Sequence, residues 1–148
     1  MNQKLVLGLV MFAIFLSWSA GSAAEKCMMC GMNAALSETK FTARIIDGSK
    51  QVTAGDYAFC CLRCFLTFEK RVGKEKIRKI KSRDYDKGTM FEAEKGFFLV
   101  ESEKRPTGSM TPFMLIFSDR PTADKYQTVY GGRVIGWDEV RRYTEKNR

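Results

Sequence analysis

The sulfur-containing residues are the part of this sequence best suited to chemistry. Five cysteines fall into two clusters, the pair Cys27-x-x-Cys30 and the group Cys60-Cys61-x-x-Cys64. Two CxxC pairs in one short chain are typical of a metal site, because thiolates brought together in this way can hold one ion. We therefore treat Cys27, Cys30, Cys60, Cys61 and Cys64 as candidate metal ligands.

Methionines strengthen this interpretation and indicate which metal to expect. Met28, Met29 and Met32 surround the first cysteine pair, and Met110 stands in a polar loop where burial gives no reason for a methionine. Thioether together with thiolate is a soft donor set that selects Cu(I), whereas a zinc site needs only four thiolates. Met110 is therefore a further candidate ligand, and Cu(I) is the expected ion, with zinc as the alternative.

Other interpretations of the cysteines stay open. Cysteines of an exported domain commonly form structural disulfides, and those on a helix can simply be buried in the core. A structural zinc module would use Cys27, Cys30, Cys61 and Cys64 and leave Met110 without a role. A thiol-disulfide oxidoreductase would use Cys27 and Cys30, although this pair does not open a predicted helix after a strand, as that redox motif does.

Histidine is absent from the chain. This excludes imidazole general-base catalysis and every metal site that needs an imidazole ligand. We accordingly expect a binding protein and not an enzyme.

The N-terminal residues predict export. Lys4 precedes an apolar stretch from Leu5 to Leu16 and the small residues that end at Ala24, which is the pattern of a signal peptide over residues 1–24. The apolar stretch is shorter than the roughly 17 to 25 residues of a spanning helix. We expect a soluble periplasmic protein that is attached to the membrane only if the signal remains uncleaved.

The charge of the chain is strongly positive. It is +8, and +7 after loss of Lys4, the only charged residue of the signal. Export argues against a nucleic-acid partner, which such a charge would otherwise suggest. The basic stretch from Lys74 to Arg83 is expected to be a solvated face that could also guide docking.

The elements that must position the sulfurs can be predicted from periodicity and turn residues. A helix is expected from about Tyr57 to Val72 with Asp56 as N-cap, so that Cys60, Cys61 and Cys64 lie near its positive end, which favours thiolates. In the first half we also expect a hairpin of 41–47 with 51–54. In the second half we expect a strand-like segment over 90–102, a strand over 113–117 and a helix that starts at Ser118 or Asp119 and stops at Gly131. A strand over 133–137 and a tail helix capped by Asp138 complete the chain.

These elements predict an α+β fold. We expect residues 25–148 to form one metal-binding domain with possible halves 25–88 and 89–148, where each half contains strands, one helix and a further strand. We expect two small related halves, each a short antiparallel sheet with one packed helix.

Three landmarks resemble the NosL-type accessory proteins of nitrous oxide reductase assembly, which deliver Cu(I) in the periplasm. Cys27-Met28-Met29-Cys30-Gly31-Met32 resembles that family's CxxCGM motif, and Phe59-Cys60 resembles its phenylalanine-cysteine pair. The closing segment is similar as well, in Met110, Phe113 to Ser118, Ala123, Gly131-Gly132-Arg133-Val134 and Asp138-Glu139-Val140. The resemblance spans nearly all of the chain after the signal.

The resemblance implies a function and a ligand set. It implies Cu(I) held between Cys27 or Cys30, with Met32 nearby, and Met110, in a chaperone that supplies a client copper enzyme or its assembly factors. Two departures are visible: Glu25 and Lys26 precede Cys27, where many members carry a lipidated cysteine, and Thr111 stands in place of a glycine. Cys61 and Cys64 add sulfurs that the family pattern does not require.

Overall fold

The structure is a computed structural model that describes residues 25–48 and 52–148. The expected signal peptide and the first residue of the expected return strand, Gln51, lie outside the described residues. Among the described helices, none is long and apolar enough to cross a membrane.

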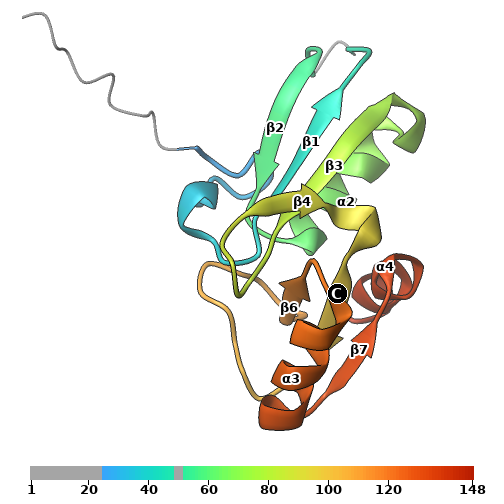
Figure 1. The fold of residues 1–148 in the computed structure, drawn as a ribbon. Coiled ribbons are helices and arrows are strands. Elements are labelled where there is room, and N and C mark those ends of the chain that lie inside the picture. The colour runs from blue at the N-terminus through green and yellow to red at the C-terminus, as the bar shows by residue number, and fades with distance from the viewer. Residues whose placement is uncertain (1–24, 49–51) are drawn as a thin grey trace, which may run out of the picture.

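The first half is a four-stranded antiparallel sheet. Its strands are β1 (Phe41–Ile45), β2 (Gly55–Phe59), β3 (Ile77–Arg83) and β4 (Met90–Glu92), in the order β2-β1-β3-β4. Alternate residues of β1 are buried, namely Phe41, Ala43 and Ile45, as expected for a sheet with one covered face. Figure 1 shows this sheet with α2 behind it.

Helix α2 (Leu62–Val72) covers the buried face of the first sheet. Its apolar residues Leu62, Phe65, Leu66 and Phe68 are buried, which matches the predicted period. The helix ends at Gly73, whose φ of 95° suits glycine. A short 3₁₀ turn, η3 (Lys74–Lys76), then leads into β3.

The second half repeats this arrangement with fewer strands. Strands β5 (Phe97–Val100), β6 (Met114–Phe117) and β7 (Arg133–Ile135) pair antiparallel in the order β6-β5-β7. Helix α3 (Arg120–Tyr130) connects β6 to β7, as α2 connects β2 to β3. The side chain of Asp119 accepts a hydrogen bond from the Thr122 backbone N–H at the helix start. The chain closes with helix α4 (Trp137–Lys146).

The two halves share a hydrophobic core, beside which the second half has a smaller apolar cluster of its own. The ring of Trp137, at the start of α4, lies 6.4 Å from Phe41 of β1, 6.5 Å from Phe65 of α2 and 5.9 Å from Phe98 of β5. These contacts join both sheets and two helices around one aromatic centre. The expected α+β fold of two related halves is confirmed, and the halves are packed as one unit.

Several predicted boundaries are wrong. The helix does not start at Tyr57: residues 55–59 form β2, which pairs with β1, and Asp56 binds Arg44 across that pair instead of capping a helix. The predicted return strand at 51–54 therefore gives way to β2. The apolar pattern of residues 55–59 fits either a helix or a strand, because a strand with one face covered by a helix also carries apolar residues.

The segment 90–102 and the tail helix also differ from expectation. Residues 90–102 form two strands in different sheets, β4 and β5, separated by the 3₁₀ turn η4 (Ala93–Lys95). The first sheet therefore continues past residue 88, the possible boundary between the halves. The cap residue of α4 is Gly136 and not Asp138, which lies in the first turn.

Candidate metal site

The first cysteine pair lies in a closed turn, which we call the sulfur loop (residues 27–32). Lys26 and Asn33 form an isolated antiparallel bridge at its base, and the backbone N–H of Cys27 donates to Met32 O at 2.7 Å. The N–H of Gly31 donates to Cys27 O at 2.9 Å, and its φ of +74° is a value that side-chain residues rarely adopt. Backbone geometry thus holds Cys27 and Cys30 on one turn.

The sulfur loop is attached to the first sheet at the point where the second cysteine cluster begins. The N–H of Met28 donates to Ala58 O near the end of β2, at 2.9 Å. Cys60 and Cys61 follow β2 directly, and Cys61 is the N-cap residue of α2. Cys64 lies in the first turn of that helix, so only Cys64 is on the helix as predicted.

Two buried hydroxyl groups fix the backbone of Cys60. Ser37 Oγ donates to Cys60 O at 2.5 Å and Thr39 Oγ1 donates to the same oxygen at 3.0 Å. Both residues are fully buried. Sequence reasoning missed them, because serine and threonine in a loop carry no signal that distinguishes a buried support from a solvated turn.

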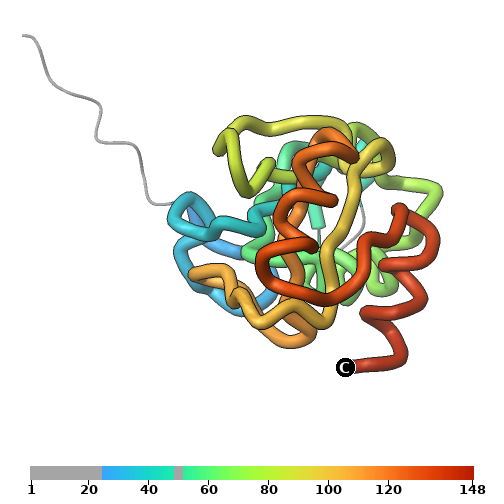
Figure 2. The backbone as a smooth tube through the Cα atoms, turned by 60° about the horizontal axis from the view of Figure 1, so that its bottom comes forward, coloured from blue at the N-terminus to red at the C-terminus, as the bar shows by residue number. Residues whose placement is uncertain are grey.

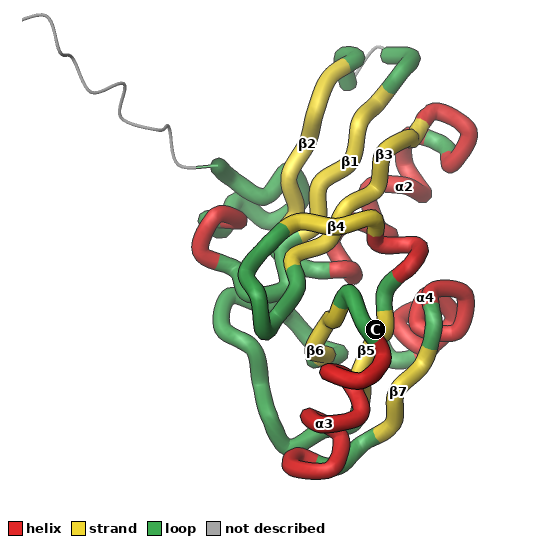
Figure 3. The backbone as a smooth tube through the Cα atoms, in the orientation of Figure 1, coloured by secondary structure: helices red, strands yellow, loops and turns green. Residues whose placement is uncertain are grey.

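Met110 reaches the cysteines from a loop of the second half. Figure 2 shows this loop, in gold and orange, beside the blue N-terminal segment, and Figure 3 shows that both segments are without regular structure over most of their length. The N–H of Glu38 donates to Thr107 O at 3.1 Å, and Arg63 Nη1 of α2 donates to Thr111 O at 3.2 Å. The sulfur Sδ of Met110 lies 3.8 Å from Sγ of Cys64.

The sulfurs of four cysteines form a compact group. Those of Cys27, Cys30, Cys60 and Cys64 all lie within 4.8 Å of one another. Cys60 Sγ is 3.5 Å from Cys30 Sγ, 3.6 Å from Cys64 Sγ and 3.8 Å from Cys61 Sγ. Four thiolates at about 2.3 Å from one ion lie about 3.8 Å apart, whereas the sulfurs of a disulfide are about 2.05 Å apart. The spacing suits metal ligation, and all five cysteines are free thiols.

Cys61 and Met32, which were also predicted as ligands, are not among these four cysteines. The four-thiol set contains Cys60 where the predicted zinc quartet contained Cys61, which lies beside the set through its contact with Cys60. Met32 is 38% exposed, and its carbonyl oxygen accepts the hydrogen bond from the Cys27 N–H that closes the sulfur loop. The structure therefore brings together five cysteines and Met110.

The sulfur-bearing residues differ in their exposure to solvent. Cys27, Cys60, Cys61 and Cys64 are buried, Met110 is partly buried and Cys30 is exposed. An ion held here would be largely shielded from water, while Cys30 remains open to an approaching ligand.

The pKa values of the cysteine thiols are shifted in opposite directions. Hydrogen bonds from the side chains of Cys60 and Cys64 lower the pKa of Cys27. Hydrogen bonds from the side chains of Cys60 and Cys64, with the backbone of Cys64 and of Met110, also lower the pKa of Cys61. The bond to Cys27 in turn raises the pKa values of Cys60 and Cys64. Thiol ligands bind a metal as thiolates, so an ion that recruits the thiols with raised pKa values must displace their protons.

Comparison with known proteins agrees with this architecture. The sequence profile of the NosL family matches residues 20–144. Among solved structures, the chain is similar to the copper chaperone NosL from Shewanella denitrificans, with 19% sequence identity, a TM-score of 0.60, and coverage of 77% of this chain and 87% of that chain. At this identity the likeness concerns the fold. No protein of curated function matches the sequence.

Proposed function

The chain belongs to the NosL family, and from this premise we propose that it is a copper chaperone that binds Cu(I) through cysteine and methionine sulfur and passes it to a client copper protein. The observation that carries the proposal is the convergence of four thiol sulfurs within 4.8 Å of one another, with the thioether of Met110 in contact with one of them. Such a donor set selects cuprous ion. The similar protein from Shewanella denitrificans is itself described as a copper chaperone.

Transfer follows from the way the ligands are distributed. They come from three separate segments, the sulfur loop, the start of α2 and the loop that carries Met110. Cys30 is exposed, so a partner's thiolate or thioether can reach the ion there first and displace the remaining ligands in turn. No catalytic turnover is required, and we place this protein among carriers rather than enzymes.

We further propose the periplasm as the compartment and nitrous oxide reductase, or a factor that assembles it, as the client. The basic stretch 74–83, part of which is exposed on β3, would guide docking by charge. Transfer should then slow as ionic strength rises, because salt screens charges that lie more than about 8 to 10 Å apart.

A structural zinc site is the second candidate, because four cysteines at this spacing are also a complete zinc ligand set. The two candidates differ in their dependence on Met110. A zinc site would be satisfied by thiolates, whereas a cuprous site uses the thioether.

Competition against metal chelators separates these functions. The protein, purified anaerobically with its cysteines reduced, should bind Cu(I) far more tightly than Zn(II), and both Met110→Leu and Cys30→Ser should weaken Cu(I) binding by at least about tenfold. Met90→Leu, a methionine change on β4, is the matched control and should leave affinity unchanged. Tighter binding of Zn(II) than of Cu(I), unchanged in Met110→Leu, would favour the zinc module. Reduction of a disulfide substrate in the absence of metal would favour the oxidoreductase.

A further inference from the structure

The sulfur group offers more donors than one cuprous ion uses. In thiolate and thioether sites Cu(I) is satisfied by about two or three sulfur ligands. Here five free thiols and the thioether of Met110 are in one connected set. At least half of these donors would remain idle around a single ion.

The donors come in two sets from different segments, and Cys60 Sγ lies close to sulfurs of both; the sets also approach each other directly, since Cys27 and Cys30 lie within 4.8 Å of Cys64. On one side stand Cys27 and Cys30 of the sulfur loop, with Cys30 Sγ 3.5 Å from Cys60 Sγ. On the other side stand Cys61 and Cys64 at the start of α2, at 3.8 and 3.6 Å from the same sulfur. Met110 extends the second set, since its sulfur contacts Cys64.

The position of Cys60 is fixed independently of any metal. Its carbonyl oxygen is held by the hydroxyls of Ser37 and Thr39, and its residue is fully buried. A thiolate sulfur has enough lone pairs to bind two soft cations at once. Cys60 is therefore placed as a bridging ligand between the two sets.

Charge compensation favours a second ion. Three or four thiolates around one monovalent cation leave a net negative charge, and four of the five cysteines are buried. An uncompensated charge in the interior is costly. A second cuprous ion reduces that negative charge by one further unit.

We infer that this chain holds two cuprous ions in one thiolate cluster, bridged by Cys60: an outer ion with Cys27 and Cys30, and an inner ion with Cys64 and with Cys61 or Met110. The inference rests on the proposed function, because it assumes that Cu(I) is the bound metal. It adds the inner site and the bridge. The outer ion lies beside the exposed Cys30, whereas the inner ion is enclosed by the buried cysteines, so the outer ion should exchange first.

Stoichiometry tests the inference directly. The reduced protein is titrated anaerobically with Cu(I) and examined by native mass spectrometry, and we expect two copper ions per chain. The double variant Cys61→Ser/Met110→Leu should retain one ion, and so should Cys27→Ser/Cys30→Ser. Met90→Leu should retain two. Circular dichroism of each variant establishes that it is folded.

X-ray absorption at the copper edge supplies a second measurement that needs no variant. Two ions that share a bridging sulfur give copper-copper scattering at full loading, and an isolated ion does not. Saturation of the wild-type protein at one copper per chain, without copper-copper scattering, would overturn the two-ion cluster and leave the chaperone proposal intact. Failure to bind Cu(I) at all would overturn both.

Discussion

The carbonyl oxygen of Cys60 shows how single residues set the geometry of the sulfur group. Ser37 and Thr39 donate to it at 2.5 and 3.0 Å, and Ser37 Oγ also accepts from the backbone N–H of Thr39 at 3.1 Å. All three residues are fully buried. Buried hydrogen bonds of this kind are costly to break, because the partner that remains has no water to replace the lost group.

Ser37→Ala should therefore affect both stability and metal binding. We expect a loss of roughly 1 to 3 kcal/mol in the free energy of unfolding, together with weaker Cu(I) binding, because the Cys60 backbone loses its shorter hydrogen bond. Urea denaturation and chelator competition measure the two effects. Ser102→Ala, which removes a partly buried hydroxyl that donates to Lys104 O, is the control and should leave Cu(I) affinity as it was.

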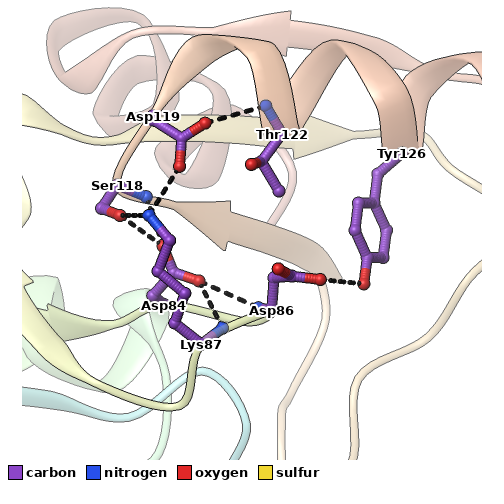
Figure 4. A network of polar contacts seen from close by, with 7 residues as sticks. All are labelled: Asp84, Asp86, Lys87, Ser118, Asp119, Thr122 and Tyr126. Atoms are coloured by element: carbon purple, nitrogen blue, oxygen red, sulfur yellow. Dashed lines mark hydrogen bonds and ion pairs between the residues drawn. The ribbon is translucent and has the colours of Figure 1, made fainter.

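Between elements, Asp84 joins the turn after β3 to the end of β6. Its carboxylate accepts hydrogen bonds from the backbone N–H groups of Asp86 and Lys87 at 2.9 and 2.8 Å, and from the backbone N–H and hydroxyl of Ser118 at 2.7 and 2.6 Å. Figure 4 shows these bonds and the neighbouring contacts of Asp119 with Lys87 and Thr122. One buried side chain thus connects the two sheets.

The ionised form of Asp84 is the one that this network stabilises. Burial by itself would raise the pKa of Asp84, but the four hydrogen bonds outweigh it and hold that pKa below its ordinary value. A carboxyl whose pKa is lowered by folding contributes stability at a pH above its unfolded pKa of about 4, and this contribution is lost as pH falls through the folded pKa.

Asp84→Asn should destabilise the protein by about 1 to 3 kcal/mol at neutral pH, because the amide cannot accept all four bonds. The difference between wild type and variant should shrink below about pH 4 as the wild-type carboxyl becomes protonated. Thermal unfolding of both proteins between pH 3 and 7 measures this. Asp86→Asn, at an exposed position that accepts from Tyr126, should show a much smaller effect; equal effects at the two positions would contradict the role given to Asp84.

The whole molecule places its sulfur group between the two halves. Cysteines of the first half meet Met110 of the second, and their spacing depends on how the halves are packed. Besides the aromatic contacts of Trp137, a partly buried ion pair joins the halves: Arg141 Nη2 of α4 donates to Glu69 Oε2 of α2 at 2.5 Å. Helices α2 and α4 are thereby held together on the side of the sheet that carries the shared core.

Arg141→Ala tests this junction. The variant would leave the Glu69 side chain, which is 6% exposed, without its cation, and we expect a loss of about 3 kcal/mol in the free energy of unfolding. Guanidinium denaturation measures it. The neighbouring exposed Arg142→Ala should change stability by no more than about 0.5 kcal/mol, and comparable losses in both variants would mean that general charge, and not the ion pair, is responsible.

The sequence alone determined which metal-binding atoms the protein carries and how apolar residues are spaced along its helices and strands. Cysteine spacing and the placement of Met110 predicted a soft-metal site because donor chemistry is a property of the side chains themselves. The helix end at Gly73, a buried strand over 113–117 and a helix start at Ser118 or Asp119 were also predicted from local signals, since these depend on backbone preferences and alternation within a few residues. The structure has the strand at 114–117 and the cap at Asp119.

Tertiary structure decided which of the sulfurs meet. Residues 55–59 became β2 because pairing with β1 outweighs their local preference, and this shift moved Cys60 and Cys61 from the helix to the connection before it. As a result Cys60, rather than Cys61, completes the four-thiol group. Contacts between segments distant in the chain, such as those of Ser37 with Cys60 and of Cys64 with Met110, depend on the packing of two halves around one core, and no local pattern encodes them.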